Sequence, residues 1–154
     1  MLIRRGRENN SIQHFNGGGC MTILEKAYKM RPIIEAAMAG VEDKVASQAV
    51  ELSPCLKQDG SLIKAGTRIN WNGALKRAAV DLYDAAANNP ENAPTLWEDI
   101  LYKDGVRVIP STITVGTAFA KNELGWWEDK LYISQLDNNV WTPSQNAAGW
   151  KLKE

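Results

Sequence analysis

Apolar positions near the start of the chain follow the spacing of one helix face. Thr22 and Glu25 stand in capping-box spacing, in which each side chain accepts a hydrogen bond from the other residue's backbone, so a helix is predicted to begin there. Pro32 either kinks this helix or begins a second one, and Gly40 suits its end. Steps of four and three, the seam of a heptad repeat, connect the apolar residues Ile23, Ala27, Met30, Ile34, Ala37 and Val41.

The stretch after this helix, residues 42–52, is predicted to form one or two further helical turns. The apolar stripe of the first helix covers fewer than three heptads, which favours packing against its own chain. A coiled coil between copies of the chain is the alternative, and it would make the protein a homo-oligomer through its N-terminal helix. We assign residues 21–52 to a helical segment.

From residue 53 the pattern changes to short β-prone runs divided by Gly, Pro, Asn and Asp. Two of these runs are typical of β-hairpins, because a pair of turn residues lies between apolar strands. Asn-Gly is the strongest such turn, and Glu-Asp is a weaker version of it. The same order of tryptophan, turn and leucine occurs twice: Trp71, Asn72-Gly73 and Leu75 in RINWNGALK (68–76), and Trp127, Glu128-Asp129 and Leu131 in LGWWEDKLY (124–132).

The similarity between the two halves continues beyond the hairpins. A polar stretch follows each hairpin, then a proline, and then a tryptophan at the same distance: Pro90 and Trp97, Pro143 and Trp150. The sequence therefore predicts two copies of one small antiparallel β module, residues 53–101 and 102–154, the second enlarged by VIPSTITVGTAFA. With the helical segment, the predicted fold class is α+β.

This order of residues resembles the small chitin-binding type-3 modules, carbohydrate-binding module families 5 and 12. Those are three-stranded β domains of bacterial chitinases and of phage tail proteins. The resemblance covers about two thirds of the chain, although Lys76 replaces the usual tyrosine, and Asn122 and Asp129 stand where glycines are usual. Matching residues are Gly66, Ile69, Trp71, Gly73, Pro90 and Trp97 in the first copy, and Trp127, Tyr132, Pro143 and Trp150 in the second.

Comparing the copies separates core residues from candidate sugar-binding residues. A residue kept in both copies is most simply part of the shared core, which assigns Trp71, Leu75, Trp97, Trp127, Leu131 and Trp150 a structural role.

Trp126 and Trp141 differ, because the first copy has Asn70 and Asn88 in their places. Neighbours on a strand face opposite ways, so Trp126 is predicted to point outward if Trp127 is buried. Two exposed tryptophans near each other would form a platform that stacks on a sugar. Tyr132, which matches the family's tyrosine, would either border this platform or belong to the core of the module. Alternatively, the two tryptophans cover the enlarged loop or a subunit contact.

One departure from the family bears on binding. In the chitinase modules a pair of adjacent aromatic residues follows the tyrosine and stacks on the sugar, and this chain has Leu136-Asp137 there. We therefore expect weak affinity per module, made useful when many copies engage one surface.

The first twenty residues differ in character from the rest of the chain, because they are polar, lack periodicity and end in Gly17 to Gly19. Adjacent glycine codons can spell a ribosome-binding tract, so translation is expected to begin at Met21, or else residues 1–20 form a disordered tail. Without this segment the only histidine, His14, is lost, along with Cys20.

Composition limits the chemistry. Eighteen basic residues balance eighteen acidic ones, which gives no reason to expect nucleic acid or anionic lipid as a partner. We expect no metal, no cofactor and no membrane span, since two cysteines, Cys20 and Cys55, are too few for a metal site. Acidic residues such as Glu98, Asp99, Glu123, Glu128 and Asp129 lie in turn-rich stretches, so no catalytic pair is predicted and the protein is not expected to be an enzyme.

The resemblance implies a non-catalytic protein that binds chitin or cell-wall polysaccharide, most like a phage tail or tail-fibre accessory. No signal peptide precedes the helix, which fits a virion part that becomes extracellular after lysis. The alternative is a purely structural virion protein whose modules hold neighbouring subunits.

Overall fold

The computed structural model describes residues 21–154, so the interpretation of residues 1–20 lies outside the described residues. Helix α1 (Ile23–Ala39) begins at the predicted capping box of Thr22 and Glu25 and ends at Gly40. Pro32 lies inside it, so the first helix is not divided in two. The short helix α2 (Asp43–Ala46) and the 3-10 turn η1 (Val50–Leu52) complete the helical segment.

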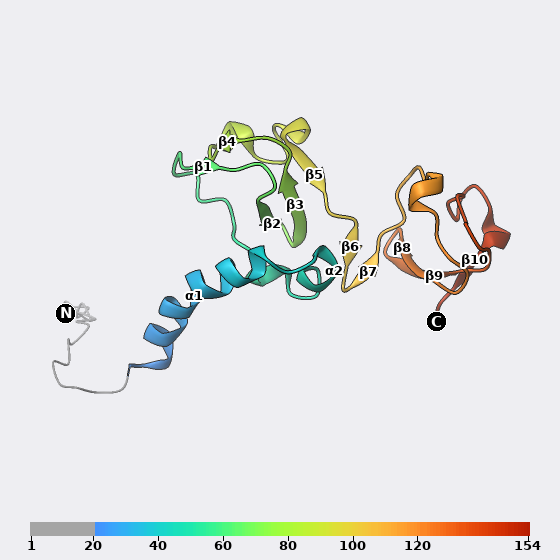
Figure 1. The fold of residues 1–154 in the computed structure, drawn as a ribbon, viewed down its shortest axis with the longest axis horizontal. Helices are drawn as coiled ribbons and strands as arrows, with labels where there is room; N and C mark the ends of the chain where they lie inside the picture. Colours follow the sequence, from blue (N-terminus) through green and yellow to red (C-terminus); the bar gives the residue numbers. More distant parts are fainter. Residues whose placement is uncertain (1–20) are drawn as a thin grey trace, which may run out of the picture.

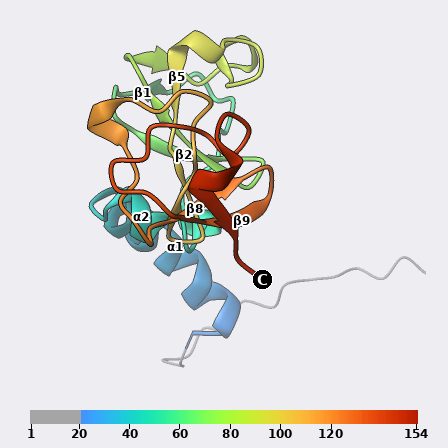
Figure 2. The same cartoon turned by 90° about the vertical axis from the view of Figure 1, so that its right-hand side faces the viewer.

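Most of the apolar stripe of α1 does not pack on its own chain as predicted, although Ile34 and Val41 are half-buried. No residue of α1 is buried, and Figures 1 and 2 show the helix running away from the β-sheets. Only its C-terminal half is attached to the rest of the chain. There Arg31 donates hydrogen bonds to the backbone oxygens of Glu51 at 3.1 Å and Ser53 at 3.3 Å.

The first β module is a three-stranded antiparallel sheet with a short two-stranded pair beside it. The sheet has the order β2-β3-β5, and the pair is β1-β4. Two 3-10 turns lie in the connection to the last strand. The bounds are β1 (Leu62–Ile63), β2 (Arg68–Trp71), β3 (Ala74–Ala78), β4 (Leu82–Tyr83), η2 (Ala86–Asn88), η3 (Pro94–Leu96) and β5 (Trp97–Asp99).

The second module repeats this sheet, strand for strand, in the order β8-β9-β10. The predicted hairpins of both modules are present, and the α+β class is confirmed. A 3-10 turn again leads directly into the last strand. The bounds are η4 (Val115–Thr117), β8 (Leu124–Trp127), β9 (Lys130–Ser134), η5 (Ala147–Gly149) and β10 (Trp150–Leu152).

The second module keeps the backbone of the first without its glycines. Gly66 N donates to Ala78 O at 2.8 Å, and Asn122 N donates to Ser134 O at the same distance. Asn122 adopts φ 69°, close to the 84° of Gly66. Asp129, which stands in the place of the turn residue Gly73, likewise adopts a positive φ of 58°. Asn and Asp tolerate the left-handed region best among non-glycine residues, which explains why the motif's glycines are replaceable here.

A third hairpin, which was not predicted from the sequence, joins the two modules (Figure 1). It consists of β6 (Tyr102–Lys103) and β7 (Val106–Arg107), turning at Asp104 and Gly105, both with positive φ. Asp-Gly is a strong hairpin signal that was available in the sequence. Gly105 N donates to the buried Ser47 Oγ at 2.9 Å, so the hairpin also contacts the helical segment.

Each module has its own small apolar cluster. The first contains Ile69, Ala78, Leu82 and Trp97, and the second Ile109, Ile113, Phe119 and Trp150. The stretch VIPSTITVGTAFA was predicted only to enlarge the second module. It also forms the core of that module, because it supplies three of the four residues of the second cluster.

The remaining predicted core residues are placed differently. Trp71 and Trp127 are half-buried against their clusters. Leu75 is buried and Leu131 half-buried, but the strand registers put both on the opposite sheet face from the clusters.

Gly125 makes room for the second cluster. It stands in β8 where β2 has the buried Ile69, and a Cβ atom there would lie 2.6 Å from Ile109 Cγ1 and 3.1 Å from Phe119 Cε1. We expect Gly125→Ala to lower the free energy of unfolding by about 1–3 kcal/mol, because these side chains cannot shift freely in a packed core. Chemical denaturation followed by tryptophan fluorescence measures the effect.

Gly116 offers the matched control, since its nearest neighbour to an added Cβ is Thr114 Oγ1 at 3.9 Å. Gly116→Ala is expected to leave stability unchanged. Equal stability of both variants would mean that Ile109 and Phe119 do not press on Gly125.

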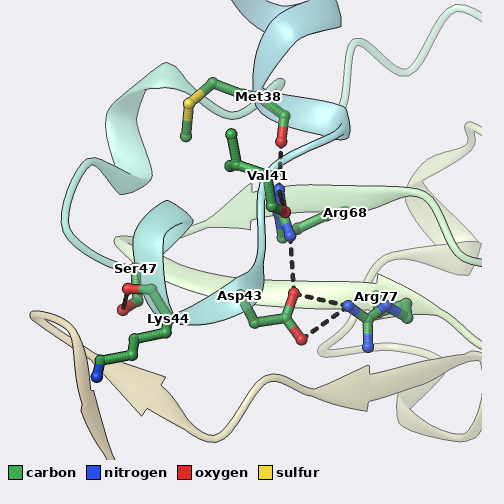
Figure 3. Close-up of polar contacts among 7 residues, drawn as sticks. All are labelled: Met38, Val41, Asp43, Lys44, Ser47, Arg68 and Arg77. Atoms are coloured by element: carbon green, nitrogen blue, oxygen red, sulfur yellow. Dashed lines mark hydrogen bonds and ion pairs between the residues drawn. The ribbon is translucent and has the colours of Figure 1, made fainter.

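The helical segment covers the face of the first sheet that lies opposite its apolar cluster (Figure 3). Arg68, with a side chain 7% exposed, donates to Asp43 Oδ1 at 2.7 Å, to Val41 O at 3.1 Å and to Met38 O. Arg77 donates to both carboxylate oxygens of Asp43 at 2.7 and 2.8 Å. Arg68 thus supplies positive charge at the carboxyl end of α1, where the last helical turn contains no basic residue.

Candidate functional site

An exposed tryptophan is held on a fixed backbone in the loop between β9 and η5. The side chain of Trp141 is 48% exposed. Its backbone N–H donates to Asn139 Oδ1 at 3.2 Å, and its carbonyl accepts from Trp150 Nε1 at 2.7 Å. Because its main chain is bonded on both sides, the ring is presented with little loss of backbone freedom on binding.

Two buried polar residues organise this loop. Asn139 is fully buried, and its Nδ2 donates to Ser134 Oγ at 3.2 Å and to Gly149 O at 3.0 Å. Thr142, also buried, donates its N–H to Gln145 Oε1 at 2.9 Å. Buried polar groups that are fully bonded specify a single loop conformation. The geometry around Trp141 is therefore built into the core of the module.

The first module exposes a different aromatic residue in the same connection. Asn88 takes the place of Trp141, since its carbonyl accepts from Trp97 Nε1 at 2.7 Å. The side-chain Nδ2 of Asn88 donates to Tyr83 O at 3.0 Å, and Tyr83 is 63% exposed. Sequence comparison missed Tyr83 because it sought aromatics at matching positions. The available signal was an aromatic anywhere between the second and third strands of each copy.

Trp126 is not the exposed residue that was predicted. It does face away from Trp127, but its ring is half-buried beneath the β6–β7 hairpin. Its Nε1 donates to Lys103 O at 2.9 Å, and Lys103 Nζ lies 4.8 Å from the ring centroid. A charge over an aromatic face stabilises such a contact. Trp126 therefore has a structural role between the hairpin and the second sheet.

Trp126 and Trp141 also do not form one platform. Trp126 pairs with Leu131 on β9, whereas Trp150, which is bonded to the Trp141 carbonyl, pairs with Ser134. Leu131 and Ser134 face opposite ways on the strand. Trp126 thus lies on the opposite sheet face from the Trp150 ring.

Tyr132 lies at the border of the second core. It is half-buried, packs against the cluster that contains Trp150, and pairs across the strands with Gly125 and Leu152. Leu152 is exposed. Tyr132 therefore lies at the edge of the apolar cluster and not beside Trp126.

Leu136-Asp137, at the position of the family's aromatic pair, has a structural role in this chain. Asp137 Oδ1 accepts from Lys121 N at 3.1 Å, and in the first module Asp81 Oδ1 accepts from Ala65 N at 2.8 Å. The hydrogen bond from Ala65 and then the contact with Lys64 lower the pKa of Asp81. These two aspartates hold the loop before each hairpin, and Leu136 beside Asp137 is exposed.

The acidic residues make surface contacts instead of facing one another across a cleft. Glu98, Asp99, Glu128 and Asp129 are exposed. Glu123 is bonded to Arg107 at 2.7 Å, and Asp129 to Lys103 at 2.8 Å, which lowers the pKa of Asp129. Among residues 21–154, no group of three or more His, Cys, Asp or Glu side chains is arranged to hold a metal ion.

Within the same part of the chain, no helix has the length and apolar character needed to cross a bilayer. No protein-family model matches the sequence, and no curated protein matches it either. Any function proposed for this chain must therefore be argued from the geometry of the described residues.

Proposed function

We propose that this chain is a non-catalytic polysaccharide-binding protein that uses one exposed aromatic residue in each β module. Trp141 is the main contact in the second module, and Tyr83 is its counterpart in the first. The observation that carries the proposal is the exposed Trp141 ring on a backbone that two hydrogen bonds fix. A ring on a backbone that is already ordered loses little further freedom when a ligand covers it.

A flat indole suits a sugar because the C–H face of a pyranose ring is apolar while its hydroxyl groups still need polar partners. Ser144 and Gln145 are exposed in the loop that carries Trp141, so polar atoms lie close to the ring along the chain. Neither module holds a second stacked aromatic of the kind that the chitin-binding type-3 resemblance implies. Single-ring stacking gives weak affinity per module, and two modules in one chain raise it through avidity.

The proposed biological setting follows the resemblance to phage tail proteins. The protein would be a tail or tail-fibre accessory of a virion and would bind chitin-like or bacterial cell-wall polysaccharide after lysis. The second candidate is a purely structural virion protein whose modules hold neighbouring subunits. The internal engagement of Trp126 favours that alternative, because it removes one of the two tryptophans expected to bind sugar.

We expect Trp141→Ala to weaken polysaccharide binding by about tenfold or more, because a central aromatic contact contributes about 2 kcal/mol. Tyr83→Ala should have a smaller effect, and the double variant should abolish retention. Pull-down of the full chain on insoluble chitin and on purified peptidoglycan sacculi measures the loss. Both single variants should keep their unfolding free energy within about 1 kcal/mol, since the rings are exposed.

Tyr28→Ala is the matched control, because Tyr28 is an exposed aromatic outside both modules. It should bind like the parent. Parent-level binding by the Tyr83 and Trp141 double variant, with both modules folded, would overturn the glycan proposal in favour of the structural one.

A further inference from the structure

Helix α1 exposes large apolar side chains along most of its length. Ile23 is 88% exposed and Ile33 69%, and Leu24 and Met30 are more than half exposed. In both cartoon views the helix projects from the β modules (Figures 1 and 2). A side-chain set of this kind on a free helix is typical of an interface.

A helix of this length is marginal in water when it buries nothing. α1 has 17 residues, and Pro32 removes one of its internal hydrogen bonds. Its local support includes the Thr22–Glu25 capping box and the Arg31–Glu35 ion pair. Exposed pairs of this kind contribute little. The N-terminal half of the helix therefore needs a partner to stay folded.

The spacing of the apolar residues indicates the partner. The exposed Ile23, Ala27 and Met30 and the half-buried Ile34 follow the steps of four and three of a heptad seam, the pattern by which a helix packs against another copy of itself. Pro32 falls on the opposite side of the helix from this seam, where its ring does not enter the interface. Leu24 and Ile33 flank the seam and widen it.

The size of the stripe bears on how many copies meet. A helix of 17 residues is roughly 25 Å long and about 10 Å wide. One face of the helix therefore has a flat footprint of roughly 250 Å², which is small beside the roughly 600 Å² of accessible surface that each partner buries in a small stable interface. Contact with two neighbours approaches that size, and the widened stripe provides for it.

We infer that α1 is an oligomerisation helix, and that its apolar stripe is covered by the same helix from other copies of this chain in a helical bundle. The β modules then stand outside the bundle, and each assembly presents several of them in parallel. This inference does not depend on whether the modules bind sugar.

The test compares two substitutions on the same helix of the full chain. Met30→Glu places a charge on the stripe, whereas Tyr28→Glu places one on the outer side. Sedimentation velocity across a wide range of concentration should show the parent and Tyr28→Glu as assemblies larger than a dimer. Met30→Glu should sediment as a monomer, or with an apparent dissociation constant raised at least about tenfold.

Two further readouts keep the test decisive. All six tryptophans lie outside the helical segment, so unchanged tryptophan fluorescence shows that the modules remain folded in each variant. Circular dichroism should show lost helix content in Met30→Glu only. A parent chain that is monomeric at every concentration, or equal assembly of both variants, would overturn the inference, and α1 would then be covered by a different molecule.

Discussion

Replacing Trp150 by alanine is expected to unfold the second β module, with a loss of about 3–5 kcal/mol in the free energy of unfolding. Trp150 is 6% exposed and meets the Phe119 ring edge-on, with centroids 5.2 Å apart. Its indole N–H also holds the Trp141 carbonyl. A module with one small cluster cannot spare its largest member. Thermal melts followed by near-ultraviolet circular dichroism measure the loss.

Two comparisons make this result specific. Trp97→Ala should act in the same way on the first module, since Trp97 is 7% exposed in the equivalent strand position. Leu152→Ala changes an exposed residue of the same strand as Trp150 and should cost less than about 1 kcal/mol. A normal melt of Trp150→Ala would contradict the repeat as an account of packing.

The repeat was predictable because the hairpin register depends on local signals. Asn72-Gly73 and Glu128-Asp129 both adopt positive φ at both positions, and each sets the pairing of its two strands. The closing tryptophans, Trp97 and Trp150, were predictable from their equal distance to Pro90 and Pro143. The capping box of Thr22 and Glu25 is likewise local. These features require only neighbours along the chain.

Packing between distant segments was not predictable in this way. Gly125 departs from Ile69 of the first copy, and only the structure shows that Ile109 and Phe119 fill the space. Strand alternation correctly turned Trp126 away from Trp127, but the hairpin that covers Trp126 comes from β6 and β7. An outward direction on a strand is therefore different from exposure to solvent.

The contact between the helical segment and the first sheet could not be predicted either, because it depends on a carboxylate far along the chain from its partners. Asp43 accepts hydrogen bonds from both Arg68 and Arg77. In the second module, apolar Leu124 and Ile133 occupy the equivalent strand positions. The network is thus specific to the first module, and it determines where the helical segment attaches.

We expect Asp43→Asn to detach the helical segment from the first sheet and to cost about 3 kcal/mol, near the lower end for a broken buried ion pair. The lower end applies because the Asp43 side chain is 26% exposed. Arg68 is left buried without an anion, although it still donates to Met38 O and Val41 O. Hydrogen exchange of the α2 amides, such as Ser47 N–H bonded to Asp43 O, measures the detachment.

The same contact is expected to weaken in acid. Burial raises the pKa of Asp43, but hydrogen bonds from Arg77 and Arg68 outweigh it and lower the pKa overall. A lowered folded-state pKa means that the contribution to stability is complete above about pH 4, the ordinary value for Asp, and is lost as pH falls through the folded-state value. Protection of the α2 amides should therefore fall in acid in the parent but not further in Asp43→Asn.

Asp129→Asn, which alters an exposed pair with Lys103, should cost less than about 1 kcal/mol and leave α2 protected. Full protection of α2 in Asp43→Asn would show that the remaining contacts, such as those of Arg68 with Met38 O and Val41 O, hold the helical segment without the carboxylate.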